Sequence, residues 1–162
     1  MLPETGPGGS DLRWLRGQPG WEKVSDVAGR DTTSILAGCR EGLVDCLVVM
    51  GNNIGAEAKF GVDAVEAVRR VPFSVCIDLF LNETSSQADV VLPACSFVEK
   101  DGTFVNTDGI HQPIRAAFAP RGQSRPDWRI LADLLARVGS PVPYFTAADV
   151  RRELDALTER IA

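Results

Sequence analysis

The sequence predicts an α/β fold in which helices flank an open, mainly parallel sheet. Three short apolar runs, at residues 44–50, 71–79 and 90–92, are rich in β-branched residues and end at polar or proline positions, as buried parallel strands do. Between the first two runs, residues 56–70 carry apolar side chains at a helical period, namely Phe60, Val62, Val65 and Val68. A strand, a helix and a second strand in this order are typical of a parallel crossover unit.

The pattern divides the chain into three parts. Residues 1–30 are rich in glycine, proline and charged residues without periodicity, which predicts an irregular N-terminal arm. Residues 31–140 form the predicted α/β domain, and its first helix begins near the capping residue Asp31. Residues 141–162 are expected to form a C-terminal helix that Thr146 caps and that continues through the end of the chain.

Two further elements complete the predicted domain. A short fourth strand is expected at residues 103–105, with His111 in the loop that follows it. A helix opens at Asp127 and closes at Gly139. Its apolar residues are expected to point inward, and they are Trp128, Ile130, Leu131, Leu134, Leu135 and Val138.

Composition excludes several classes of protein. With 162 residues, 44% apolar residues and 24% charged residues, the chain is long enough for one domain with its own core. A net charge of −5 with interspersed acids and bases argues against nucleic acid as a partner. No apolar run approaches the roughly 18 residues of a membrane span, so we expect no direct membrane insertion and a cytoplasmic location.

The cysteines and the single histidine do not predict a metal site. Cys39, Cys46, Cys76 and Cys95 are 7, 30 and 19 residues apart, which matches neither zinc nor iron–sulfur ligand spacing. Cys46 and Cys76 lie inside apolar runs and are expected to be small core residues. His111, as the only histidine, is expected to be a surface residue.

Polar residues follow the ends of the predicted strands, where open α/β sheets bind their ligands. An asparagine amide in Gly51-Asn52-Asn53 can both donate and accept, and the Asp78 carboxylate can accept from ribose hydroxyls or from the N–H edge of a base. Residues 84–86 can open a short helix whose N–H groups meet an anion, and Lys100 can neutralise a phosphate or donate to a ring carbonyl. Each also fits a structural role, as a turn, an N-cap, a solvated lysine or, for Asp127, a carboxylate that favours a helix start.

Taken together, the order of these motifs is specific. Gly51-Asn52-Asn53 and Asp78 precede the runs Ala88-Asp89-Val90-Val91-Leu92-Pro93-Ala94, residues 99–109 (EKDGTFVNTDG) and Arg125-Pro126-Asp127-Trp128. From about Thr33 to Gly139 this resembles the molybdopterin oxidoreductase superfamily. That superfamily includes formate dehydrogenases, periplasmic-type nitrate reductases and the large iron–sulfur subunit of respiratory complex I.

The resemblance implies a Rossmann-like domain that holds half of a molybdopterin guanine dinucleotide. The residues it implies as contacts are Asn53, Ile77, Asp78, Lys100 and Asp127. Ile54 stands where many members have proline, a departure that bears on the Asn53 contact. The iron–sulfur portion, the metal-ligating residue and the closing β-barrel of such enzymes do not fit into these 162 residues. We therefore expect a partial domain that has no iron–sulfur ligands and does not turn over alone.

Two branches of the superfamily lead to different expectations. The first, which the C-terminal helix in place of a barrel favours, is a structural part of a complex I large subunit, without a cofactor in this chain. Its partners would be iron–sulfur and flavin subunits, and a complex would hold it at the periphery of the inner membrane. The alternative is a formate-dehydrogenase-like portion that binds the dinucleotide with molybdenum or tungsten, and retention of Asp78, Lys100 and Asp127 favours it. In either branch we expect an exposed apolar face where further protein packs.

Overall fold

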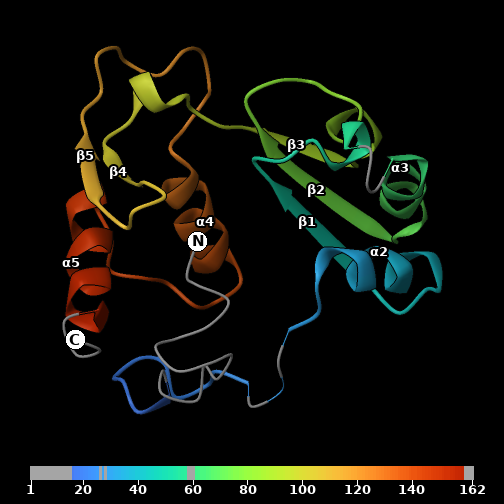
Figure 1. The fold of residues 1–162 in the computed structure, drawn as a ribbon, viewed down its shortest axis with the longest axis horizontal. Helices are drawn as coiled ribbons and strands as arrows, with labels where there is room; N and C mark the ends of the chain where they lie inside the picture. Colours follow the sequence, from blue (N-terminus) through green and yellow to red (C-terminus); the bar gives the residue numbers. More distant parts are fainter. Residues whose placement is uncertain (1–15, 26, 28, 58–60, 159–162) are drawn as a thin grey trace.

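The computed structural model describes residues 16–25, 27, 29–57 and 61–158. Figure 1 shows their arrangement, and the first six elements are α2 (Thr32–Arg40), β1 (Cys46–Met50), the 3-10 turn η1 (Ile54–Ala56), α3 (Gly61–Arg70), β2 (Phe73–Asp78) and η2 (Ser85–Gln87). They are followed by β3 (Val90–Pro93), η3 (Phe97–Glu99), β4 (Gly102–Val105), β5 (His111–Ile114), α4 (Asp127–Arg137) and α5 (Ala147–Thr158). Phe60 and Ile161, which were expected in helices, lie outside the described residues.

The predicted parallel sheet is confirmed. β1, β2 and β3 lie side by side in that order, and both pairings are parallel. Helix α3 makes the crossover between β1 and β2, as the helical period between the two apolar runs predicts. The fold is therefore α/β, while the predicted boundaries at residues 30 and 140 stay predictions.

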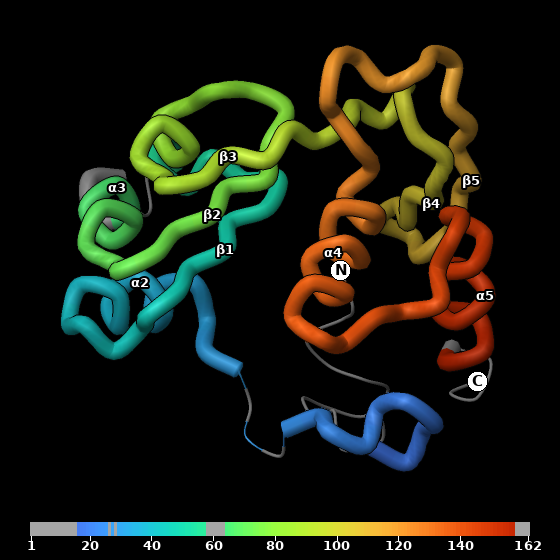
Figure 2. Tube along the Cα trace, turned by 180° about the vertical axis from the view of Figure 1, so that it is seen from behind, coloured from blue at the N-terminus to red at the C-terminus, as the bar shows by residue number. Residues whose placement is uncertain are grey.

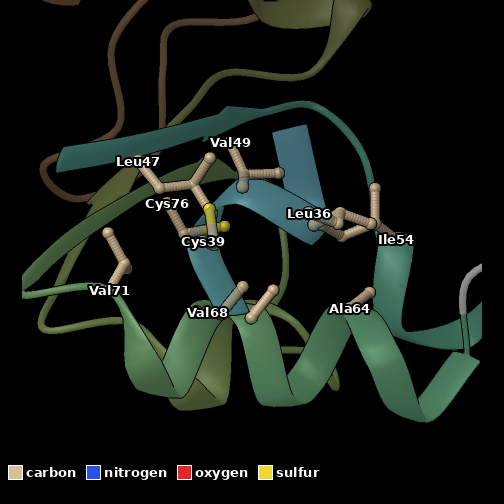
Figure 3. Packing of buried hydrophobic residues seen from close by; sticks show 10 residues of the cluster. Leu36, Cys39, Leu47, Val49, Ile54, Ala64, Val68, Val71 and Cys76 are labelled. Atoms are coloured by element: carbon tan, nitrogen blue, oxygen red, sulfur yellow. The ribbon is translucent and has the colours of Figure 1, made fainter. Parts of the chain in front are cut away.

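Two apolar clusters cover the two faces of this sheet. On one face α2 and α3 pack against the strands, through the ten residues drawn in Figure 3: Leu36, Cys39, Leu47, Val49, Ile54, Ala64, Ala67, Val68, Val71 and Cys76. On the other face Ile130 of α4 packs with Ile77 of β2 and Ala94 after β3. Both clusters follow from period-2 alternation along the strands, because successive side chains point to opposite faces.

The fourth predicted strand forms, but it does not join the parallel sheet. β4 pairs antiparallel with β5, a strand that the sequence analysis missed, and His111 is exposed in β5 and not in a loop. The turn between them is built by Asn106, whose side-chain oxygen accepts from the N–H groups of Asp108 and Ile110, and by Gly109 at φ +78°. An Asp-Gly pair is a hairpin signal, so Asp108-Gly109 is the feature of the sequence that predicts a second strand here.

Two predictions about burial were wrong for the same reason. Cys46 is exposed, because β1 is an edge strand and α2 and α3 cover only the face that carries Leu47 and Val49. In α4 only part of the predicted inward face is covered, so Ile130 is buried and Trp128 half-buried. The exposed fractions of the others run from 36% to 75%, for Leu131, Leu134, Leu135 and Val138.

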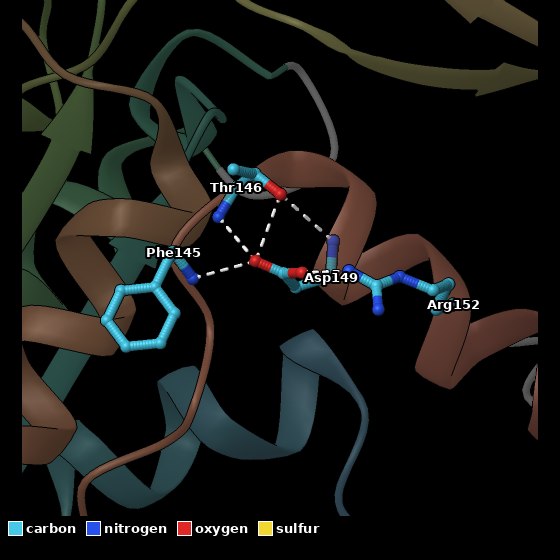
Figure 4. Close-up of polar contacts among 4 residues, drawn as sticks. All are labelled: Phe145, Thr146, Asp149 and Arg152. Atoms are coloured by element: carbon cyan, nitrogen blue, oxygen red, sulfur yellow. Dashed lines mark hydrogen bonds and ion pairs between the residues drawn. The ribbon is translucent and has the colours of Figure 1, made fainter.

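The C-terminal helix begins where the sequence predicts. The Asp149 carboxylate accepts from the N–H of Phe145 (2.9 Å) and from the N–H of Thr146 (2.7 Å), while the Thr146 hydroxyl accepts from the N–H of Asp149 at 3.3 Å (Figure 4). These N–H donors and the Thr146 hydroxyl lower the pKa of Asp149. In Figures 1 and 2, α4 lies between the parallel sheet and the group formed by β4, β5 and α5.

The described part of the N-terminal arm touches this last helix. The Trp21 indole N–H donates to the Glu153 carboxylate at 3.2 Å, and the Tyr144 hydroxyl donates to the same carboxylate. Burial and the neighbouring Glu153 carboxylate raise the pKa of Tyr144 to about 12. Trp21 thus anchors the arm on α5.

Candidate functional site

Three of the five predicted contact residues lie where β1 and β2 end, which we call the carboxyl edge of the sheet. Gly51 turns the chain there with φ +62°, a conformation that favours glycine. Its N–H donates to the carbonyl of Ile77 at 2.8 Å, so the turn after β1 lies directly against the end of β2. Asn53 lies two residues after Gly51, and Asp78 directly follows Ile77. Both residues are half-buried.

The Asn53 side chain is held by the loop that follows β2. Its Nδ2 donates to the Glu83 carboxylate at 2.6 Å. Its Oδ1 accepts from the hydroxyl of Thr84 at 2.9 Å and from the N–H of the same residue at 3.3 Å. The donated hydrogen bond from Asn53 is the largest of the causes that lower the pKa of Glu83. The amide therefore joins two turns that lie 30 residues apart in the sequence.

The Asp78 carboxylate organises its own turn. Its Oδ1 accepts from the N–H of Leu79 at 2.6 Å, and its Oδ2 accepts from the Asn82 amide at 3.0 Å. A carboxylate has about four lone-pair sites, so acceptor capacity remains for a ligand. Ile77 differs from its neighbour, because its side chain is fully buried against Ala94 and Ile130.

The predicted anion-binding start at residues 84–86 does not form as expected. The segment is a single 3-10 turn, and its first N–H groups already have acceptors. The side-chain oxygen of Asn82 accepts from the N–H groups of Thr84 (3.1 Å) and Ser85 (2.9 Å), and the carbonyl of Asn82 accepts from the N–H of Ser86 at 3.0 Å. Asn82 and Glu83 are thus residues of the edge that the sequence analysis did not select. Their signal is the polar run from Asn82 to Ser86, which follows the apolar residues Leu79, Phe80 and Leu81 after β2.

Backbone hydrogen bonds connect the carboxyl edge of the sheet to the start of α4. The N–H of Ala94 donates to the carbonyl of Asp78 at 3.0 Å, and Ala94 forms a parallel bridge with Arg125. The N–H of Cys95 donates to the carbonyl of Arg125 (3.0 Å), and the N–H of Arg125 donates to the carbonyl of Pro93 (3.1 Å). Because Arg125 lies two residues before Asp127, the start of α4 lies beside the end of β3.

The other two predicted residues meet each other there. The ammonium group of Lys100 forms an ion pair with the carboxylate of Asp127, and their side chains are 25% and 27% exposed. Lys100 follows η3, which a reciprocal pair of hydrogen bonds between Ser96 and Glu99 caps. Asp127 is the first residue of α4, where the helix dipole favours a carboxylate. The ion pair is therefore partly exposed to solvent, and it is held between the capped turn η3 and the first turn of α4.

Cys95 is buried beside this ion pair. Burial raises the pKa of its thiol, while the charges of Lys100 and Asp127 act on it in opposite directions. Among the described residues, no group of three or more His, Cys, Asp and Glu side chains is placed to hold a metal ion.

A groove of the described structure lies elsewhere. It has a volume of about 910 Å³ and is formed by β4, β5, the first turn of α4 and α5, with a mostly apolar floor that includes Val105, Ile114, Trp128 and Leu154. None of the five predicted contact residues lines it, although Asp101 and Trp128 are sequence neighbours of Lys100 and Asp127. The predicted contact residues therefore lie outside this groove, at the carboxyl edge of the sheet and at the start of α4.

Comparison with known proteins places the chain in a family. The family model of molybdopterin oxidoreductases matches residues 20–137, well over half of the sequence. The chain belongs to the molybdopterin oxidoreductase family. The match spans the parallel sheet, the carboxyl edge and helix α4, and thus all five residues implied by the resemblance.

Curated relatives of this molybdopterin oxidoreductase chain include proteins of staphylococci. A protein of Staphylococcus haemolyticus provisionally named formate dehydrogenase is 34% identical over an alignment of 170 positions, which covers 93% of this chain and 17% of the relative. A protein of Staphylococcus aureus with the same provisional name is 35% identical over 137 residues, covering 84% of this chain and 14% of the relative. The chain thus spans about one sixth of the length of the relatives that it matches. In its described part, no helix is both long and apolar enough to cross a membrane.

Proposed function

We propose that the chain is the portion of a formate-dehydrogenase-like oxidoreductase that binds a molybdopterin guanine dinucleotide. One observation carries the proposal: the connection from Asp78 through Ala94 to Arg125 brings Asp78 and the Lys100–Asp127 pair to one edge of the sheet. The names of the relatives support this function over a cofactor-free part of complex I, the branch that the C-terminal helix had favoured.

The chemistry of the edge suits the nucleotide half of such a ligand. The carboxylates of Asp78 and Asp127 can accept hydrogen bonds from base N–H groups or ribose hydroxyls, and Lys100 can donate to a phosphate or a ring carbonyl. Gly51 lets the backbone approach the ligand closely. When bound, the group supplies the molybdenum or tungsten redox centre, while the residues of this chain bind and orient it.

Turnover is assigned to protein outside these 162 residues, either in the same polypeptide or in another subunit. We propose that the protein outside these residues includes iron–sulfur carriers. We also propose that it packs on apolar side chains that are exposed in the described part of this chain. These side chains include Val48 and Met50 of β1, Phe73 of β2, Leu135 of α4 and Val138 directly after α4. The cytoplasm stays the expected compartment, with contact to the inner membrane only through a larger complex.

The test is to purify the chain from its own cells together with whatever co-purifies, and to measure its metal and nucleotide content. We expect molybdenum or tungsten together with a guanine dinucleotide. The amounts of both per chain should fall when Lys100→Ala and Asp127→Ala are combined. A matched control combines Lys23→Ala and Asp108→Ala, which remove an exposed lysine and an exposed aspartate elsewhere. Co-purifying iron–sulfur and flavin subunits without metal or nucleotide would contradict the proposal and support the complex I interpretation.

A further inference from the structure

Two polar residues are buried in the loop that follows β2. Thr84 and Ser85 are each 1% exposed, although Leu79, Phe80 and Leu81 just before them are 47% to 77% exposed. Burying a hydroxyl costs free energy unless it is hydrogen-bonded. The Thr84 hydroxyl has two partners, since it accepts from the N–H of Gly55 at 2.9 Å and donates to Oδ1 of Asn53 at 2.9 Å. Both partners belong to the turn that follows β1.

The same junction is packed as tightly as it is bonded. A Cβ atom added at Gly55 would lie 3.0 Å from Cγ2 of Val65, 3.2 Å from Cβ of Glu83 and 3.3 Å from the hydroxyl oxygen of Thr84. Any side chain there would require Val65, Glu83 or Thr84 to shift by a few tenths of an ångström. Gly55 thus allows the two loops to approach closely, and the hydrogen bonds of Thr84 hold them together.

The Asn53 amide is occupied by this junction. Its oxygen accepts twice from Thr84, and its Nδ2 donates to Glu83. A side chain bound in this way faces the neighbouring loop, and its polar atoms are largely used before any ligand arrives. What the turn has left to offer a ligand is the backbone after Gly51 and the exposed Asn52.

We infer that Thr84 is a positioning residue for the guanine nucleotide half of the ligand. Its buried hydroxyl fixes the turn at residues 51–55 against the end of β2, and Asn53 and Glu83 complete the lock. Asn53 then acts by holding the turn and not as a direct contact. The inference rests on the proposed function for its ligand, and it assigns a role to Thr84, Glu83 and Gly55 that the resemblance does not.

The test compares Thr84→Val, which keeps the shape and removes the hydroxyl, with Thr84→Ser, which keeps the hydroxyl. Two quantities are measured on the 162-residue chain: the hydrogen-exchange rate of the Gly55 amide and the dissociation constant for guanosine diphosphate. Val68→Ala is the matched control, because it truncates a buried side chain of α3 outside the junction. Glu83→Ala and Glu83→Gln form a second pair at an exposed position, in case Thr84→Val fails to fold.

We expect Thr84→Val to speed exchange at Gly55 and to raise the dissociation constant, each by about tenfold or more, since a buried donor loses its acceptor. Thr84→Ser and Val68→Ala should change the dissociation constant by less than about threefold. Faster exchange with unchanged affinity would overturn the inference, because Thr84 would then be structural only. If the unsubstituted chain fails to bind the nucleotide, the proposed function fails and the inference fails with it. Binding by the unsubstituted chain and by Thr84→Val alike overturns the inference alone.

Discussion

Replacing Lys100 and Asp127 separates a ligand contact from a structural ion pair. Both side chains are about one quarter exposed, one in a loop and the other at the first position of a helix, so neither fills the core. A pair at this degree of exposure contributes on the order of 1 kcal/mol to stability. We therefore expect Lys100→Ala and Asp127→Ala each to lower the free energy of unfolding by about 1 kcal/mol or less.

The effect on binding should be larger. A hydrogen bond to a charged group contributes about 1.5–3 kcal/mol, which corresponds to a loss of affinity of about tenfold to a little over a hundredfold. The assay is calorimetric titration with guanosine diphosphate, paired with urea unfolding of the same samples. Val91→Asp is the opposite case, because Val91 packs against the cluster beneath α2 and α3. It places an unpaired charge against this apolar cluster and should destabilise by about 3 kcal/mol or more.

The contrast between these variants decides the assignment. Equal losses of stability in Lys100→Ala, Asp127→Ala and Val91→Asp would refute the view that the first two residues serve a ligand. Unchanged affinity in both single variants, with the unsubstituted chain binding normally, would refute it as well. Lys23→Ala, at an exposed lysine of the N-terminal arm, should change neither quantity.

Three further predictions follow from burial and capping. Ile77→Ala should lower the free energy of unfolding by about 2–5 kcal/mol and Ile77→Val by about 0.5–1.5 kcal/mol in urea titrations, because the side chain is fully buried; equal, small effects would contradict this. The pKa of Asp149 is lowered in the folded state. Its contribution to the free energy of unfolding is therefore present above the ordinary carboxylate pKa and is lost as pH falls through the pKa of the folded state. Asp149→Asn should therefore flatten the dependence of the urea midpoint on pH between about pH 6 and about pH 3, whereas Asp108→Asn should not. Mass spectrometry after brief treatment of the native chain with a thiol reagent should find modification at the exposed Cys46, and protection of the buried thiols Cys39, Cys76 and Cys95, whose pKa values burial raises.

Local patterns were sufficient to predict the sheet and most helix ends. The apolar runs at β1, β2 and β3 and the helical period of α3 describe a parallel sheet before any long-range contact is known. The caps at Asp31 and Thr146 depend on side chains within three residues, so they can be read from the sequence. Periodicity does not report whether a partner covers a face, which is why Cys46 and the second half of α4 were wrongly expected to be buried.

The sequence by itself determined the α/β class and the succession of strands and helices along the chain. It also determined the identity of the polar residues that follow the strands, because hydrophobic period and turn chemistry are local properties. Tertiary structure decided what those polar residues do. It joined Lys100 to Asp127 across 27 positions and Asn53 to Glu83 across 30, and it buried Thr84 between two turns. Such pairings depend on how strand ends are brought together by packing, and no local pattern encodes that geometry.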